Sequence, residues 1–194
     1  MSDDLAARLA GLLSQLPGGV QTEWEATPAA VLIPLFLDQG DWNLLFTRRT
    51  DSVDVHRGQV AFPGGRIEPG DRSAAEAALR ESEEEIGLRA ADVRVLGQLN
   101  PLLTVTQFAV TPVIGVIPWP YPLRPNHKEV AKCFGVPLHW LAESANLEVR
   151  SRQPLVPGLT VQVYTFKPYE GEVIWGVTAR ITTSLLDLLA GSLA

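Results

Sequence analysis

The sequence predicts a mixed α/β fold in which helices cover both faces of a β-sheet. Two observations support this prediction. A continuous apolar run at residues 29–37 is followed by a turn signal and a returning strand at 42–47. Apolar residues recur at helical spacing over residues 4–16, 73–87 and 178–190. Strands and helices therefore alternate along the chain instead of forming separate halves.

The remaining strands are predicted from shorter signals. They are residues 59–62, 93–96, 104–117, 136–141 (ending in a short helical turn), and a hairpin of 161–167 with 173–175 that turns at Glu170–Gly171. Pro34 predicts a bulge or an edge position in the first apolar run. The proline-rich segment 118–126 is predicted to be a loop. With no repeat, linker or composition shift, we expect a single domain over 1–194, with residues 1–25 as an N-terminal helical extension.

Composition and charge narrow the function. The chain has 194 residues, of which 46 % are apolar, and a formal net charge of −6 with no basic run. Because nucleic-acid backbones are bound by clustered Lys and Arg, we expect no nucleic-acid partner. The start Met1–Asp4 is acidic, unlike a signal peptide, and four prolines interrupt the most apolar stretch, 109–123. We therefore expect a cytoplasmic protein that does not enter a membrane.

The second predicted helix has clear ends. Ser73 followed by Glu76 is typical of a capping box, and Gly87 supplies the left-handed residue that ends the helix. Its remaining positions divide into an apolar face and an acidic arc. The face expected to pack on the sheet consists of Ala75, Ala78, Leu79, Ser82 and Ile86.

The acidic arc predicts a metal site. Glu81, Glu84 and Glu85 project together near the C-terminal end of the helix, where like charges and the helix dipole both disfavour them. A divalent cation with oxygen ligands would remove both penalties. A glutamate-rich helix face is more often simply solvated surface. Two neighbours favour the metal site here: the backbone turn Gly64–Gly65, and Arg80, which can fix a glutamate by a charged hydrogen bond.

These residues carry a resemblance to a known family. The segment Gly65-Arg-Ile-Glu-Pro-Gly-Asp71, followed by Arg80-Glu-Ser-Glu-Glu-Glu-Ile-Gly-Leu88, resembles the Nudix box, G-x5-E-x7-R-E-U-x-E-E-x-G-U. Asp71 replaces the first Glu, eight residues instead of seven precede Arg80, and Ser82 replaces an aliphatic residue. The half of the motif associated with metal binding is intact.

The departures are similar to those of the coenzyme A pyrophosphatase branch of that family. Its upstream motif, L-L-T-x-R-S…H-x-G…F-P-G-G, reads here Leu45-Phe-Thr-Arg-Arg-Thr50, then His56-Arg-Gly-Gln-Val-Ala-Phe-Pro-Gly-Gly65. An arginine expected between these two parts is Asp54 in this chain. Including downstream similarities, the resemblance covers roughly residues 30–185.

The resemblance implies a Nudix-type α/β/α sandwich and an enzyme that uses Mg²⁺ or Mn²⁺. The implied metal ligands are Glu81 and Glu85, with Glu84 assisting and the Gly65 carbonyl as an extra ligand. The implied general base is Glu81 or Glu84, with Glu129 as an alternative from a loop, and Arg80 supports the catalytic glutamates.

The substrate implied by the resemblance is CoA or an acyl-CoA, cleaved to 4′-phosphopantetheine and adenosine 3′,5′-bisphosphate. The Gly64–Gly65 turn would approach it, Arg66 would contact phosphate, and Arg48, Arg49 and Arg57 are candidates for binding the 3′-phosphate. Other Nudix substrates, such as ADP-ribose or NADH, and a non-catalytic nucleotide-binding regulator remain alternatives. A homodimer is left open by the sequence.

Overall fold

The computed structural model describes residues 2–16, 26–50, 58–152 and 161–191. Within them, one sheet holds the strands β1 (Thr27–Asp38), β2 (Asp41–Arg49), β3 (Val60–Ala61), β4 (Gly64–Arg66), β5 (Arg94–Gln98), β6 (Leu102–Leu103), β7 (Phe108–Val116) and β8 (Val130–Pro137). A separate pair consists of β9 (Leu147–Arg152) and β10 (Val161–Phe166). The helices are α1 (Ser2–Gln15), α2 (Ala74–Ile86), α3 (Leu138–Ala142) and α4 (Gly176–Ala190).

The central sheet is mixed. Its main path runs β3-β2-β1-β7-β5, and β8 pairs with β2. β1 is parallel to β7 and antiparallel to β2. The β1–β2 hairpin turns at Gln39–Gly40, where φ is 49° and 95°, and positive φ at both central residues matches the right-handed twist of a hairpin. The predicted strand pair at 29–37 and 42–47 is confirmed.

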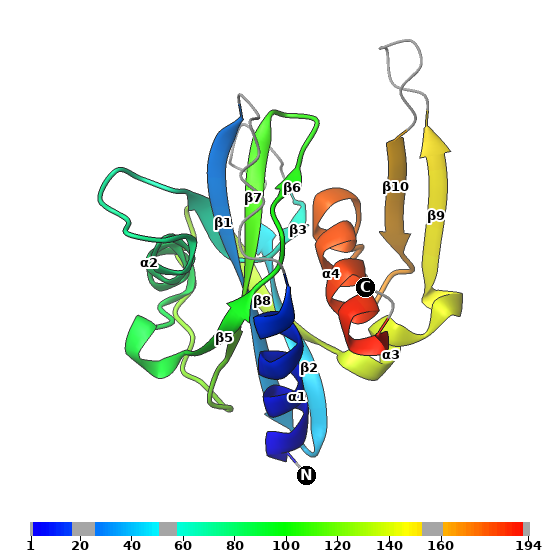
Figure 1. Cartoon of the computed structure of the whole chain (residues 1–194), viewed down its shortest axis with the longest axis horizontal. Coiled ribbons are helices and arrows are strands. Elements are labelled where there is room, and N and C mark those ends of the chain that lie inside the picture. The colour runs from blue at the N-terminus through cyan, green and yellow to red at the C-terminus, as the bar shows by residue number, and fades with distance from the viewer. Residues whose placement is uncertain (1, 17–25, 51–57, 153–160, 192–194) are drawn as a thin grey trace.

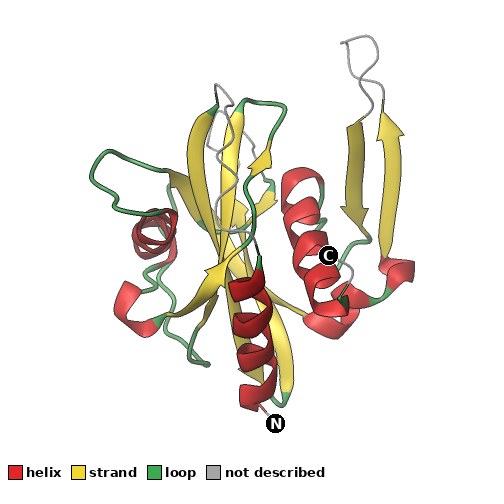
Figure 2. Cartoon of the chain, viewed as in Figure 1, coloured by secondary structure: helices red, strands yellow, loops and turns green. Residues whose placement is uncertain are grey.

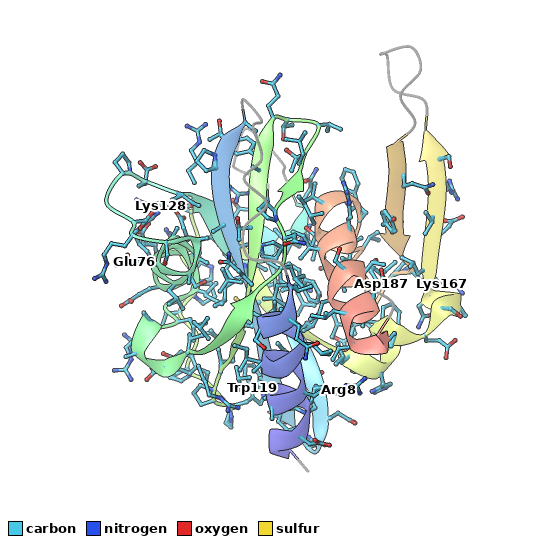
Figure 3. All side chains as sticks on the ribbon, in the orientation of Figure 1. Arg8, Glu76, Trp119, Lys128, Lys167 and Asp187 are labelled. Carbon is cyan, nitrogen blue, oxygen red and sulfur yellow. The ribbon has the colours of Figure 1, made fainter. Side chains whose placement is uncertain are left out.

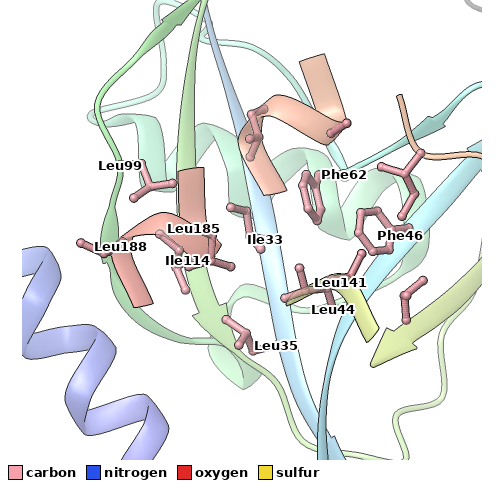
Figure 4. Packing of buried hydrophobic residues seen from close by; sticks show 14 of the residues in the cluster. Ile33, Leu35, Leu44, Phe46, Phe62, Leu99, Ile114, Leu141, Leu185 and Leu188 are labelled. Carbon is pink, nitrogen blue, oxygen red and sulfur yellow. The ribbon is translucent and has the colours of Figure 1, made fainter. Parts of the chain in front are cut away.

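Helices cover both faces of the sheet, as the sequence predicts (Figures 1 and 2). α2 packs on one face, over alternate β1 residues such as Ala30 and Leu32. α1 and α4 pack on the other face, where Ile33, Leu44 and Ile114 meet leucines of α4 (Figure 4). This alternation follows from the period of two along a strand. The result is an α/β/α sandwich.

The helix predictions are confirmed at both ends of the chain. α1 matches the predicted 4–16 and joins α4 through Arg8, whose guanidinium donates to the Leu189 carbonyl at 2.6 Å (Figure 3). α4 matches the predicted 178–190 and ends at Gly191, in the left-handed conformation. No helix in the described ranges is both long and apolar enough to cross a membrane.

The interpretation of Pro34 is wrong. The strand has neither a bulge nor an edge there, because β1 is central and Pro34 lies in unbroken parallel register with Gly115 of β7. On its other side, β1 pairs with β4 up to Val31 and with β2 only from Leu35. Pro34 therefore occupies a gap between two partner strands, where a missing N–H donor costs no ladder hydrogen bond.

Three strand predictions need correction. Residues 104–107 form a turn closed by Gln107 at φ 61°, so β7 begins only at Phe108, and the short β6 before it was not predicted. The strand predicted at 136–141 begins earlier, at Val130, and then continues into α3 as expected. The predicted hairpin of 161–167 with 173–175 survives only as bridges around the Glu170–Gly171 turn. The main partner of β10 is β9, which was not predicted.

Candidate active site

The helix α2 is fixed by both of its ends. Ser73 accepts a hydrogen bond from the backbone N–H of Glu76 at 3.1 Å, and Gly87 closes the helix at φ 67°. The predicted boundaries 73–87 are confirmed. The capping box is only half formed, because the Glu76 carboxylate accepts from the N–H of Arg72 instead of that of Ser73. Both ends of the glutamate-bearing helix are nevertheless set by local sequence.

The face of α2 that packs on the sheet is rotated from the predicted one. Ala78, Ser82 and Ile86 are buried as expected, but Ala75 and Leu79 are only partly buried. The buried set is Ala77, Ala78, Ser82, Glu85 and Ile86. Ser82 is tolerated in this face because its hydroxyl donates to the Ala78 carbonyl at 2.6 Å. The rotation carries Glu85 into the interface with the sheet.

Glu85 is therefore a buried acid. Its side chain is 7 % exposed. Burial raises the pKa of Glu85 to about 7, against the lowering effects of Arg49 and of a backbone hydrogen bond from Gly64. The negative charges of Glu81 and Glu129 raise this pKa further. Three carboxylates thus repel one another around Glu85, an arrangement that a cation would stabilise.

Glu81 lies directly over Gly65. A Cβ atom built on Gly65 would stand 2.5–2.7 Å from the carboxylate atoms of Glu81. The prediction of a turn at Gly64–Gly65 is wrong, because both residues belong to strand β4 and pair with Val31 and Ala30 of β1. The absence of a side chain at residue 65 is therefore what lets the carboxylate rest against the backbone of β4.

Arg80 ties the helix to the preceding loop. Its guanidinium donates two hydrogen bonds to Asp71, at 3.0 and 3.1 Å, and one to Glu81 at 2.7 Å. It also donates to the Arg66 carbonyl at 3.1 Å and reaches Glu84 at 3.5 Å. These hydrogen bonds from Arg80 hold the pKa of Asp71 below its usual value. Asp71, known from the sequence only as a departure from the Nudix box, is a structural partner of Arg80.

The three predicted glutamates are not equally placed. Glu81 and Glu85 lie against Gly65 and Gly64 of β4, whereas the side chain of Glu84 is 61 % exposed and faces Arg80 and solvent. In the described ranges, no three Asp, Glu, His or Cys side chains are gathered closely enough to hold a metal ion. The roles of these glutamates as metal ligands and bases stay predictions.

The loop that precedes β8 also borders the candidate site. The backbone N–H groups of Arg124 and Asn126 donate to the Ile86 and Glu85 carbonyls, each at 2.8 Å. Glu129 follows in the same loop, and its carbonyl accepts from the N–H of Thr50 at 2.9 Å. These bonds bring Glu129 to the end of α2. The prediction of a loop at 118–126 is confirmed, since no helix or strand forms there.

The predicted substrate-binding arginines have different surroundings. Arg49 lies 3.9 Å from the Glu85 carboxylate. Arg48 instead faces Glu172, at 3.6 Å. Arg66 is exposed, with its guanidinium 5.6 Å from the centre of the Phe108 ring. Arg57 lies outside the described residues. Among Arg48, Arg49 and Arg66, only Arg49 brings its side chain close to a glutamate of the predicted metal site.

Sequence reasoning missed one buried acid. Glu172 is 8 % exposed and pairs with Lys132 at 2.8 Å as well as with Arg48. It joins the connection before α4 to β2 and β8. No signal in the sequence marks it, because it follows an ordinary Glu-Gly turn.

An open hollow of about 810 Å³ lies on the outer side of α2 and is lined by residues including Arg72, Arg80, Glu83 and Glu84. It excludes Gly65, Glu81 and Glu85. We place the candidate site at Gly65, Glu81 and Glu85, because the carboxylates meet a closely approached backbone there. Arg80 and Glu84, which neighbour that site, also line the hollow.

Comparison with known proteins gives the family. The NUDIX domain family profile matches residues 26–156. The uncharacterized Nudix hydrolase NudL of Yersinia pestis (strain Pestoides F) is 42 % identical over 160 residues, which cover 81 % of this chain and 77 % of that protein. NudL of Yersinia pseudotuberculosis serotype O:1b gives the same values. The chain therefore belongs to the Nudix family.

It is accordingly a Nudix hydrolase, an enzyme of a class that acts on pyrophosphate bonds and generally uses divalent cations. Solved structures agree on the fold. DR0079 from Deinococcus radiodurans has a TM-score of 0.54 at 18 % identity, covering 88 % of this chain and 89 % of its own. A NUDIX hydrolase from Alicyclobacillus acidocaldarius has a TM-score of 0.51 at 20 % identity, covering 62 % and 83 %.

The residues present suit a divalent cation. The candidate donors are carboxylate and carbonyl oxygens, which Mg²⁺ and Mn²⁺ prefer. The Glu81 carboxylate occupies the space that a side chain at residue 65 would fill, so an acidic group is available at this point of the site. The mutual repulsion around buried Glu85 also favours a cation.

Proposed function

We propose that this enzyme hydrolyses the pyrophosphate bond of coenzyme A or its derivatives, giving 4′-phosphopantetheine and adenosine 3′,5′-bisphosphate. One observation carries the proposal. The described parts of the upstream motif end against the glutamates of the Nudix box: Arg49 lies 3.9 Å from Glu85, and Gly65 lies under Glu81. The motif that resembles the CoA branch therefore lies against the motif associated with metal binding, which supports the proposal.

In this proposal Glu81 and Glu85 hold Mg²⁺ or Mn²⁺, assisted by Glu84 and the Gly65 carbonyl. The cation, when bound, neutralises the diphosphate and lowers the pKa of water. Arg80 orients Glu81 through its 2.7 Å hydrogen bond. The absence of side chains at Gly64 and Gly65 of β4 lets the substrate approach the backbone closely, and Arg66 contacts a phosphate.

The general base is Glu81, Glu84 or Glu129 in this proposal. Glu84 is the most exposed of the three, so its carboxylate is the easiest to turn toward an attacking water. Glu129 sits on a loop that is hydrogen-bonded to the end of α2. Single Glu→Gln variants at the three positions, compared by the pH dependence of kcat, would identify the base as the one whose loss removes the acidic limb.

The 3′-phosphate of CoA needs cations of its own. Arg48 and Arg57 are proposed for this role. Arg48 lies 3.6 Å from the Glu172 carboxylate, which also pairs with Lys132 at 2.8 Å, so two cationic side chains lie side by side there. Cationic side chains are the groups that bind phosphate.

The direct test is product analysis. The purified protein is incubated with CoA and Mg²⁺ or Mn²⁺, and products are assigned by mass spectrometry. The proposal expects 4′-phosphopantetheine and adenosine 3′,5′-bisphosphate. Turnover of ADP-ribose or NADH with CoA untouched would refute the substrate while leaving the hydrolase class intact. Binding of nucleotide without any product would favour the regulator alternative.

The glutamate roles are tested by substitution. Glu81→Gln and Glu85→Gln should each lower kcat by about 100-fold or more, because each removes a charge that holds the cation. Glu83→Gln is the matched control, since Glu83 is an exposed glutamate on the same helix. Thermal unfolding checks that all three variants fold. Wild-type rates in both Glu81→Gln and Glu85→Gln would remove these residues from the mechanism.

Self-association is also proposed, with β9 as the surface. In the described ranges β9 pairs only with β10, so its outer edge is open to a second strand. Antiparallel pairing of two copies about Val149 would set Glu148 of each opposite Arg150 of the other. Light scattering should show a dimer that Glu148→Arg weakens and a further Arg150→Glu restores. A monomer at about 100 μM would refute the idea.

We further propose that the enzyme works in the cytoplasm, because its single cysteine, Cys133, cannot form an internal disulfide and so suits a reducing compartment. Cell fractionation with detection of the native protein tests this. Recovery in a secreted or membrane fraction would refute it.

A further inference from the structure

We propose that Arg49 binds the scissile diphosphate of the substrate and not its remote 3′-phosphate. The inference rests on the proposed function, because it takes the Glu81–Glu85 site as the place where the bond is cleaved. It assigns different roles to Arg49 and to Arg48, its neighbour in sequence.

The two arginines point to opposite sides of the sheet. Consecutive residues of a strand alternate in direction. Arg48 faces Glu172, whereas Arg49 faces Glu85 on the side covered by α2. The pairing of β2 with β8 also shifts register between them, from Arg48–Lys132 to Arg49–Val130. Such an irregularity at a strand end re-aims a side chain.

The guanidinium of Arg49 has an unused donor. Its Nε atom is buried and has no hydrogen-bond partner in the described part of the chain. The 3.9 Å separation from Glu85 is an ion-pair distance and too long for a hydrogen bond. Buried donors are nearly always satisfied, so an exception beside a candidate active site indicates an acceptor that arrives with the ligand.

A phosphate oxygen fits that acceptor. The planar fork of arginine presents parallel N–H donors that match two phosphate oxygens. The other arginine among the glutamates, Arg80, already donates to Asp71, Glu81 and the Arg66 carbonyl. If Glu85 holds a cation, a phosphate bound to that cation would lie within reach of the Arg49 guanidinium. The 3′-phosphate, on the far side of the ribose, belongs at a different place.

A plainer role for Arg49 is to balance the charge of Glu85. The two readings differ in what they require of the side chain. Charge balance needs only a cation at residue 49, which lysine supplies. Diphosphate binding needs the fork, so lysine would not replace it.

The first test compares two substrates, CoA and dephospho-CoA, which lacks the 3′-phosphate. Arg49→Met should lower kcat/KM for both by the same factor, about 30-fold or more. Lys167→Met, which removes an exposed cation just beyond β10, is the control and should change neither by more than about 3-fold. A fall for CoA alone would assign Arg49 to the 3′-phosphate and overturn the proposal, as would an unchanged rate.

The second test needs no turnover. Calorimetry measures the binding of methylenediphosphonate, which cannot be hydrolysed, in the presence of Mg²⁺. Wild type and Lys167→Met should bind alike, whereas Arg49→Met and Arg49→Lys should both bind about 10-fold or more weakly. Wild-type affinity in Arg49→Lys would support charge balance and overturn the proposal. Arg49→Lys also serves if Arg49→Met fails to fold.

Failure of the proposed function is distinguishable. If the wild-type enzyme cleaves neither CoA nor dephospho-CoA but cleaves another diphosphate, the substrate proposal fails. The calorimetric comparison still decides the role of Arg49.

Discussion

Replacing Gly65 with alanine isolates the position of one carboxylate from the stability of the fold. An alanine Cβ would stand 2.5 Å from the carboxyl carbon of Glu81, and ordinary contact begins at 3.4 Å. The carboxylate must therefore move by about 0.9 Å. Because the Glu81 carboxylate lies at the end of a flexible side chain, it can move without disturbing the backbone. Gly65 does not adopt a left-handed φ, so alanine brings no backbone strain there.

The expected result is a large loss of rate with little loss of stability. A misplacement of about 1 Å in a reacting site costs on the order of 100-fold in rate, or about 2.7 kcal/mol of barrier. The free energy of unfolding should change by less than about 1 kcal/mol, since a tolerated Gly→Ala change is usually neutral or mildly stabilising. Initial rates of product formation measure the first quantity, and urea unfolding measures the second.

Gly64→Ala is the contrasting variant. At φ 155° its Cβ would meet the backbone of Ala30 and Val31, which cannot give way. We expect it to lose more than about 1 kcal/mol of stability as well as activity. A Gly65→Ala enzyme with the wild-type rate would refute the reasoning, since Glu81 would then work equally well when displaced.

Two further predictions concern titration. The pKa of Asp71 is lowered by Arg80, so the pair stabilises the fold above the unfolded pKa of Asp71, near 4, and this contribution is lost as pH falls through the lower folded value. Asp71→Asn should be less stable at pH 7 and show a shallower decline of unfolding free energy between about pH 5 and pH 2; parallel curves would contradict this. Burial raises the pKa of the Cys133 thiol to about 12, with a smaller effect from Glu85. Folded protein at pH 8 should react with a thiol reagent far more slowly than protein in urea, and equal rates would be inconsistent with a protected thiol.

The ends of α2 were predictable because their signals are local. Ser73 and Gly87 act within one turn of the helix, and both perform as predicted. Strand pairing was less accessible, since β9 is recognisable only through β10, and Pro34 is accommodated by a gap between two other strands. Local sequence carries no information about such distant partners.

The candidate site, like the fold, has parts that local sequence predicts and parts that it does not. The glutamates, Arg80 and the glycine pair are readable from their types and spacing, although the two glycines lie in strand β4 and not in the predicted turn. The sequence did not separate Arg48 from Arg49, because the strand predicted at 42–47 ended before both, and no local signal indicates which of them would reach Glu85. That depends on the register shift against β8 and on the packing of α2, both of which are tertiary. Glu172 had no local signal at all.

The main-chain bonds from Arg124 and Asn126 to the last turn of α2 have a mechanical consequence. They make the helix terminus and the segment leading to Glu129 a single rigid unit, although the two are distant along the chain. No side-chain replacement removes these bonds except proline, which lacks the amide hydrogen. The alignment of acids from two segments is thus protected against most substitutions at residues 124 and 126, because these bonds do not depend on the side chains there.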